Sequence, residues 1–312
     1  MTTSGTTSNT SSRNRILARA ARFVNAIGEA EQMTATQVVE FSEALNAMVK
    51  HWQVSGIHVW SVREATLFPQ PGQYQYTVGR DATDHVTESY AETSTTDNIV
   101  VSAVTIPVSS TAAVTVGQHI GVVTDSAAVH WSTVSAKTTT TITIADAMPE
   151  ASGRGAKVWT YSSRIARPIK IVGARRYNVS SGNEIPVMLQ SRLDYQALPS
   201  KRDEGAMVSI FYDRLRVTGV VNIWRVPALP TELLKFTWHR PLEIFTTGSD
   251  EPDFPDEWEQ ALAWNLADQM AGLYPVKTSM QRQIPLNAAR YLDEMAGADR
   301  ESESVFFGVD MS

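Results

Sequence analysis

Residues 36–60 read TQVVEFSEALNAMVKHWQVSGIHVW, and this stretch decides the fold of the N-terminal part of the chain. Its apolar residues lie three and four positions apart, which places them on one stripe of a helix of about four to five turns. The stripe consists of Val38, Phe41, Leu45, Met48 and Trp52. Thr34 or Thr36 can cap the start of the helix, and Gly56 can end it in the left-handed conformation. We expect a short strand, residues 57–60, directly after this glycine.

A shorter helix is predicted before it, over residues 13–28, because Ile16, Ala20, Phe23 and Ile27 form a second stripe. The first 12 residues are rich in serine and threonine and contain no apolar segment of the kind found in signal peptides. We expect them to form a flexible tail.

The composition limits both the architecture and the chemistry of the protein. A chain of 312 residues is long enough for one large domain or two ordinary ones. Its net charge of −6 argues against tight binding of nucleic acid, which needs clustered lysine and arginine. The absence of cysteine excludes disulfides and thiolate chemistry and fits assembly in a reducing cytoplasm. No apolar run approaches the length of a transmembrane helix.

The composition changes between residues 95 and 162. Residues 95–160 include 13 Thr, 11 Val and 5 Ile, and this density of β-branched side chains is typical of short strands. The predicted strands are residues 99–106, 119–124, 129–136, 140–144 and 157–161. We expect them to form a small β-barrel or sandwich that is inserted into a larger core.

The core is predicted to resume at residue 163. Strands are expected at residues 167–172, 186–188, 207–212, 219–224 and 233–238, with a short helix over residues 191–198. Pro255 marks the start of a helix that runs to residue 273, and a last helix is expected over residues 285–296. The predicted fold is therefore α+β: a helical bundle with a mixed β core (residues 13–94 and 163–298), the inserted all-β domain (95–162) and a C-terminal extension (299–312).

Nothing in the sequence predicts an enzyme, a cofactor or a metal site. The six histidines have no metal-ligand spacing, and no nucleophile motif is present. One segment has residue types that glycoside hydrolysis requires, because six carboxylates lie beside Phe254 and Trp258. They are Asp250, Glu251, Asp253, Asp256, Glu257 and Glu259. Acidic residues at the start of a helix are equally explained by the helix dipole.

A basic segment suggests a different role for these acids. Five bases occur without an intervening acid: Arg164, Arg167, Lys170, Arg175 and Arg176. In a ring, one surface of each subunit meets a different surface of the next. The basic segment of one subunit could therefore contact Asp250, Glu251, Asp253, Asp256 and Glu257 of its neighbour. The alternative is that both segments are solvated or pair within one subunit.

Five features follow one another along the chain and together resemble a known family. They are the helix pair, Trp52-x-x-x-Gly56-Ile57, Gly72-Gln73-x-x-Tyr76, Tyr195-x-x-Leu198-Pro199-x-Lys201, and the helix that begins Pro255-x-x-Trp258. In this order they resemble the head-to-tail adaptors of short-tailed bacteriophages, a family that includes tail accessory, packaged-DNA-stabilisation and tail tubular proteins.

The resemblance implies a structural subunit of the virion that is assembled in the host cytoplasm. About twelve copies would form a ring that binds the portal protein, extends the channel for double-stranded DNA, retains packaged DNA and docks the tail nozzle. In this family the C-terminal segment reaches into crevices of the portal, which makes Val305, Phe306, Phe307 and Val309 portal-docking candidates. Alternatively, this apolar segment folds back on its own core.

Two other functions stay open at this point. A receptor- or glycan-binding tail protein would use Trp131 and Trp159 of the β-rich segment to stack on sugars, although both residues also suit a strand core. A peptidoglycan hydrolase would use carboxylates from the acidic segment.

Overall fold

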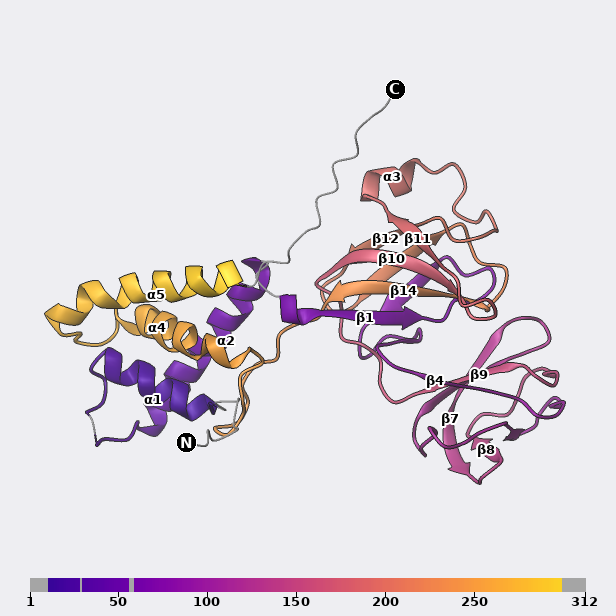
Figure 1. Ribbon diagram of the computed structural model, residues 1–312, viewed down its shortest axis with the longest axis horizontal. Helices are drawn as coiled ribbons and strands as arrows, with labels where there is room; N and C mark the ends of the chain where they lie inside the picture. Colours follow the sequence, from indigo (N-terminus) through magenta and orange to yellow (C-terminus); the bar gives the residue numbers. More distant parts are fainter. Residues whose placement is uncertain (1–10, 29, 56–58, 299–312) are drawn as a thin grey trace, which may run out of the picture. The chain divides into compact units, whose positions relative to one another are not determined.

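The computed structural model describes residues 11–28, 30–55 and 59–298, and it shows a mixed α+β protein (Figure 1). The α+β class predicted from the sequence is confirmed. The chain divides into two compact units. The helical unit contains the described residues up to Ser61 and those from Leu242 onward, whereas the sheet unit is the continuous segment Val62–Pro241.

The helical unit is built from both ends of the described chain. Its helices are α1 (Arg13–Phe23), α2 (Ala35–Ser55), α4 (Glu259–Met270) and α5 (Thr278–Ala298), with single 3-10 turns η1 (Val59–Ser61) and η2 (Asp256–Trp258). Helix α2 starts where the sequence predicts, because Gln37 N donates to Thr34 Oγ1 and Thr34 N donates to Gln37 Oε1. This reciprocal pair satisfies two backbone groups at the start of the helix.

The predicted stripe of α2 faces the core of the helical unit. Phe41, Leu45, Met48 and Trp52 are buried, and Val38 is half-buried against the same cluster. Helix α4 is buried along Leu262, Leu266 and Met270, and it packs against α1, α2 and α5. An aromatic group closes one part of this core: Trp52, Trp60, Phe254 and Trp258, with ring centroids 5.1–6.1 Å apart.

Three predicted boundaries in this unit are wrong. Helix α1 ends at Phe23 rather than at residue 28, because Asn25 adopts a left-handed conformation with φ 59°. Residues 56–58 lie outside the described residues, and Val59–Ser61 forms a 3-10 turn, so the strand expected at 57–60 begins only at Val62. Helix α5 does not start at Pro285 but contains it. The buried residues Ile284 and Ala288 on either side of the proline keep the helix continuous despite one lost hydrogen bond.

The sheet unit contains an eight-stranded sheet in the order β2-β13-β12-β11-β10-β14-β1-β3. Neighbouring strands are antiparallel except β11 and β12, which are parallel. The strands are β1 (Val62–Leu67), β2 (Gln75–Val78), β3 (Val86–Thr87), β10 (Lys170–Asn178), β11 (Glu184–Leu189), β12 (Ser209–Arg214), β13 (Gly219–Trp224) and β14 (Glu232–His239). The short helix α3 (Arg192–Ala197) lies between β11 and β12, as the sequence predicts.

This sheet curls until its two end strands lie close together. Strands β2 and β3 are at opposite ends of the strand order, yet only residues 79–85 connect them. The Asp84 carboxylate, two residues before β3, accepts hydrogen bonds from Thr77 N (2.6 Å) and Thr77 Oγ1 (2.8 Å) on β2. Gln73 Nε2 donates to the same carboxylate at 2.8 Å. A flat sheet of eight strands would separate its edges by about 33 Å, so the sheet has to be barrel-like.

The second sheet has six strands in the order β4-β9-β6-β7-β8-β5 and also curls on itself (Figure 1). Its strands are β4 (Ala91–Ser94), β5 (Thr105–Pro107), β6 (His119–Val123), β7 (Val129–Lys137), β8 (Thr141–Ile144) and β9 (Lys157–Tyr161). A bridge between Thr95 and Val108, with Ser109 N donating to Ser94 O at 2.9 Å, joins its two end strands.

The strand predicted at residues 99–106 is wrong over most of its length. Only Thr105–Pro107 forms a strand, and Ser102 turns the backbone with φ 65°. Val100 and Val101 are exposed in this loop. β-Branched residues favour extended backbone but do not by themselves provide a pairing partner, so the composition predicted a strand where the chain forms a loop.

The helical unit and the sheet unit meet between residues 61 and 62 and between residues 241 and 242. The sequence analysis predicted no domain boundary at either point. Residues 62–94 and 163–241 share a unit with the six-stranded sheet, and the helices form a separate one. The predicted division at 94/95 and 162/163 coincides within a few residues with the start of β4 and the end of β9. That residues 95–162 form a separate inserted domain stays a prediction.

The contact between the two ends of the eight-stranded sheet can be tested with Asp84→Ala. This change leaves Thr77 N and the Thr77 hydroxyl without their acceptor, so the free energy of unfolding should fall by about 2–3 kcal/mol. Urea unfolding followed by circular dichroism measures the loss. The control Asp81→Ala removes an exposed carboxylate from the same connection and should change stability by less than about 0.5 kcal/mol. Equal effects of the two changes would contradict this role of Asp84.

Candidate interaction surfaces

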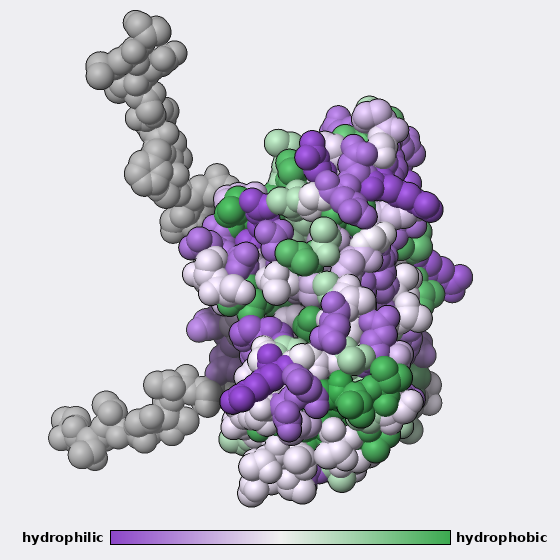
Figure 2. Space-filling model, turned by 90° about the vertical axis from the view of Figure 1, so that its right-hand side faces the viewer, coloured by the Kyte–Doolittle hydropathy of each residue, from purple (hydrophilic) through white to green (hydrophobic). Residues whose placement is uncertain are grey.

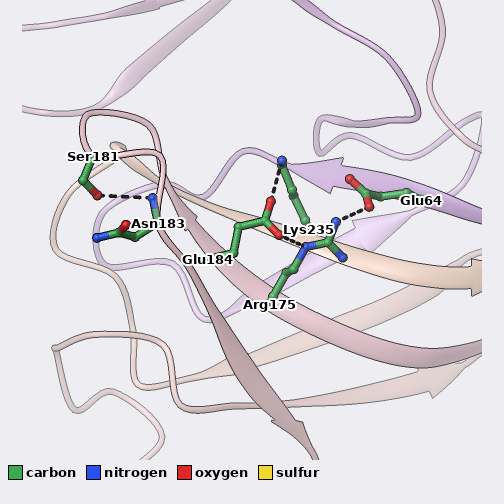
Figure 3. A network of polar contacts seen from close by, with 6 residues as sticks. All are labelled: Glu64, Arg175, Ser181, Asn183, Glu184 and Lys235. Atoms are coloured by element: carbon green, nitrogen blue, oxygen red, sulfur yellow. Dashed lines mark hydrogen bonds and ion pairs between the residues drawn. The ribbon is translucent and has the colours of Figure 1, made fainter. Parts of the chain in front are cut away.

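Part of the predicted basic segment lies in a network of ion pairs on the eight-stranded sheet (Figure 3). Arg175 on β10 lies between two carboxylates, Glu64 on β1 and Glu184 on β11, and its Nε is 2.5 Å from Glu184 Oε2. Lys235 on β14 binds the same Glu184 at 2.9 Å and lies 3.9 Å from the ring centre of Tyr177. The network therefore joins four neighbouring strands.

The network also shifts the pKa values of its members. The hydrogen bond from Lys235, followed by those from Arg175, lowers the pKa of Glu184. Burial lowers the pKa of Arg175, but the hydrogen bonds and charges of Glu64 and Glu184 outweigh it, so the pKa is raised. Both shifts favour the charged forms that the ion pairs need.

The other members of the basic segment differ in their surroundings. Arg176 pairs with Glu232 at 3.8 Å, and Arg164 Nε donates to the backbone oxygen of Asp84 at 3.1 Å. Arg167 is half-buried and Lys170 is exposed. Arg175 and Arg176 therefore pair within one subunit, which was the alternative to an inter-subunit role. A role of the segment between subunits stays a prediction.

Substitution of Arg175 tests whether this network stabilises the fold. Arg175→Met leaves Glu64 and Glu184 facing each other without their shared cation, so we expect a loss of about 1–2 kcal/mol in the free energy of unfolding. The matched change Arg176→Met removes one longer ion pair and should cost about 0.5 kcal/mol. Denaturant unfolding at low and high salt measures both values, and the difference should shrink in high salt. A loss no greater for Arg175→Met than for Arg176→Met would contradict the network's role.

The predicted acidic segment is partly used for local structure. The Asp250 carboxylate accepts hydrogen bonds from the backbone and side chains of Thr246 and Thr247, which lower its pKa. Asp253 accepts from Glu243 N at 3.0 Å. Glu259 is buried and binds Arg19 at 2.8 Å and Arg15 at 3.6 Å. The exposed members of the segment are Glu251, Asp256 and Glu257.

An aromatic cluster that the sequence analysis missed connects the two curled sheets. The His85 ring, beside β3, stacks on Trp131 of β7 with centroids 3.8 Å apart and 6° between the planes. His85 Nδ1 also lies 2.6 Å from the hydroxyl of Tyr161 on β9. His119 of β6 packs against both His85 and Tyr161. No sequence signal could have found this cluster. Its members are spread over 76 residues of the chain, from His85 to Tyr161, and follow no periodic pattern.

Burial determines the protonation of this cluster. Burial first, and then the charges of Arg164 and His119, lower the pKa of His85 from 6.5 to about 3. Burial and Arg164 also lower the pKa of His119. Burial raises the pKa of Tyr161 to about 12. Near neutral pH the two imidazoles and the phenol are therefore uncharged, as their packing requires.

The His85 site predicts acid sensitivity of the sheet unit. Its pKa is lower in the folded than in the unfolded chain, so the stabilisation is complete above pH 6.5 and is lost as the pH falls toward 3. Over this window the slope should reach about 1.4 kcal/mol per pH unit. His85→Phe keeps a ring on Trp131 and removes the titration, so its stability should fall less between pH 6.5 and 4. Urea unfolding across this range, with exposed His51→Phe as the control, measures the effect; parallel curves for His85→Phe and the wild type would contradict it.

Both tryptophans considered for sugar stacking are packed against other side chains, Trp159 fully buried and Trp131 half-buried. Trp159 is fully buried in a cluster with Phe68 and Tyr161. Trp131 stacks on His85 and lies against Gly121, where an added Cβ would come within 2.8 Å of the indole. The contacts of Trp159 are those of a core residue, and Trp131 has one ring face covered by His85.

Exposed apolar side chains occur at several places on the sheet unit, and Figure 2 shows hydrophobic side chains gathered on one of its faces. Val100, Val101 and Val104 are exposed in the loop before β5. A second group, on β10, β11 and α3, consists of Val172, Met188, Leu189 and Leu193. The portal-docking candidates Val305, Phe306, Phe307 and Val309 lie outside the described residues.

Within residues 11–28, 30–55 and 59–298, no three or more histidine, aspartate or glutamate side chains come together as metal ligands would. None of the helices in that part of the chain has the length and hydropathy needed to cross a bilayer. No family model matches the sequence, and a search of curated proteins finds no match to it.

Proposed function

We propose that this protein is a structural head-to-tail adaptor of a short-tailed bacteriophage and is not an enzyme. About a dozen copies form a ring that binds the portal, extends the channel for double-stranded DNA, retains packaged DNA and docks the tail nozzle. The protein is assembled in the host cytoplasm and becomes part of the virion.

The observation that carries this proposal is the ordered set of five features that resembles the adaptor family. Four of the five can be located within described parts of the structure. The helix pair corresponds to α1 and α2. The Pro255-x-x-Trp258 motif lies directly before α4, with Trp258 in the 3-10 turn η2. Tyr76 on β2 and Tyr195 on α3 are both buried, which agrees with a structural use of their motifs. In this proposal the helices are the bundle of the adaptor and the six-stranded barrel is an insertion into its core.

The charge distribution is compatible with a ring subunit. Glu251 and Glu257 are exposed in the acidic segment, and Lys170 is exposed in the basic segment. We therefore narrow the proposed inter-subunit contact to these three residues and Arg167. Arg175 and Arg176 are less suitable because their guanidinium groups already have carboxylate partners.

The alternative functions have weaker support. A glycan-binding tail protein would need a free aromatic face, whereas Trp131 and Trp159 are packed against other residues. A peptidoglycan hydrolase would need a carboxylic acid whose pKa is raised, whereas hydrogen bonds lower the pKa of Asp250 and Glu259 binds two arginines.

The adaptor proposal is tested by native mass spectrometry of the purified chain, alone and mixed with its cognate portal. A complex that carries about a dozen copies on the portal is the expected result. If the chain and the portal do not associate at any salt concentration, the proposal fails. The β-rich segment should then be screened against glycans, and Asp256→Asn and Glu257→Gln should be assayed for loss of cell-wall hydrolysis.

The portal-docking candidates give a separate prediction. Phe306→Ser combined with Phe307→Ser removes the aromatic side chains of the C-terminal segment, so binding to the portal should weaken at least about tenfold. The control Leu286→Ser removes an equally apolar side chain that is exposed on α5 and should leave portal binding unchanged. Titration of the immobilised portal measures both variants. Unchanged portal binding by the double variant would mean that a surface other than residues 305–309 contacts the portal.

A further inference from the structure

The first residues of the helical unit after the sheet unit are held in place by one side of helix α2. Asn46 exchanges two hydrogen bonds with the backbone of Phe245, at 2.9 and 3.0 Å. Lys50 Nζ donates to the backbone oxygen of Leu242 at 2.7 Å, and Leu242 N donates to Gln53 Oε1 at 3.2 Å. The three α2 side chains are four and three residues apart, so they stand on one face of the helix.

The segment that α2 holds, Leu242–Phe245, presents one apolar side chain to the outside, and we call it the clamped segment. Its first and last residues are buried in the helical core, whereas Ile244 is 47% exposed. Glu243 beside it is exposed, and its backbone N donates to Asp253 at 3.0 Å, which places the clamped segment next to the acidic residues 250–257. Because the backbone is already fixed, little conformational entropy is lost when Ile244 meets a partner.

A groove with an apolar base lies on the sheet unit, between β10 and β12. Its volume is about 210 Å³, and the buried residues Ile171 and Ile210 form its base. Leu189, at the end of β11, lines its edge and is 40% exposed. The Tyr212 hydroxyl donates to the backbone oxygen of Pro168 at 2.6 Å and so bridges the two strands. The groove therefore accepts a side chain but not a strand.

Two cations stand at the rim of this groove, Lys170 of β10 and Arg214 of β12. Arg214 Nη1 donates to the backbone oxygen of Ile169 at 3.2 Å, which brings its charge beside Lys170. Neither cation forms an ion pair with a described residue. An apolar side chain flanked by carboxylates is the group that such a groove would bind.

The net charges of the two units favour the same pairing. Residues 62–241, the sheet unit, contain 18 Lys and Arg against 15 Asp and Glu, a net charge of +3. The whole chain has a net charge of −6, so the rest of it carries −9. Between two copies, contact of a sheet unit with a helical unit is therefore electrostatically favoured over contact between like units.

We propose that the groove between β10 and β12 binds Ile244 of a second copy of this chain. Glu243 and Glu251 of that copy then lie beside Lys170 and Arg214. The choice of a second copy rests on the proposed ring, in which one surface of each subunit meets a different surface of the next. Ile244 gives the proposed contact between the acidic and basic segments an apolar centre, which is where interfaces gain most of their affinity.

Disulfide cross-linking tests this directly, since the chain has no cysteine of its own. Full-length protein with Ile244→Cys is mixed with full-length protein that carries Leu189→Cys, and the mixture is oxidised both free and after incubation with the cognate portal. We expect a linked dimer, because a side chain seated in the groove comes within bonding distance of its edge. Peptide mapping identifies the bond between residues 189 and 244, and circular dichroism confirms that each variant is folded.

The matched control replaces Leu189→Cys by Leu229→Cys, which is exposed on the same unit but does not line the groove, and it should give little dimer. The proposal is overturned if the 189–244 bond forms in neither condition, or if its yield is no higher than that of the control. It is likewise overturned if a chain that carries both cysteines links only within itself.

Charge reversal provides the second measurement. Lys170→Glu combined with Arg214→Glu should lower the yield of linked dimer about three- to tenfold at low salt, and Glu243→Lys with Glu251→Lys on the partner should restore part of it. An unchanged yield would contradict the proposed role of the rim cations. Portal binding is measured independently, so a chain that assembles on the portal without the 189–244 bond refutes this contact alone.

Discussion

The connection between β2 and β3 is the constraint on which the sheet unit depends. Residues 79–85 have to join two strands that stand at opposite ends of an eight-stranded order, and this is possible only if the sheet curls. Asp84 fixes the junction through Thr77, and the next residue, His85, stacks on Trp131 of the six-stranded barrel. The same short segment therefore closes one sheet and attaches the other.

The helical unit depends on a different constraint, the burial of α4. Its apolar side chains are covered by α1 and α2 from the start of the described chain and by α5 from its end. The chain consequently leaves this unit after Ser61 and returns at Leu242, with the whole sheet unit between these points. The buried carboxylate of Glu259 pairs with the partly exposed guanidinium of Arg19, so α1 and α4 are linked by charge as well as by apolar contacts.

Periodic sequence patterns predicted the local structure well. The stripe from Phe41 to Trp52 and the strand Gly219–Trp224 lie where their periodicity placed them, because 3–4 spacing and alternation reflect which side chains face a core. Strands β6 to β9 lie where the density of β-branched residues placed them. Pro285 misled the prediction because tertiary burial of Ile284 and Ala288 outweighs the local cost of proline. The loop at Val100 misled it because propensity does not specify a pairing partner.

The candidate surfaces were harder to predict, because their members meet only through the strand order. Nothing local indicates that Arg175 reaches Glu64, 111 residues away, or that His85 lies beside Tyr161. The basic segment could be read from the sequence, but whether its charges were already paired could not.

Electron cryo-microscopy of the cognate portal incubated with the purified chain tests the central claim most directly. The account predicts a ring of added density on the portal, with one helical unit and one sheet unit for each copy and an open axial channel wide enough for double-stranded DNA. A portal without added density, or with single copies bound at scattered positions, would contradict it.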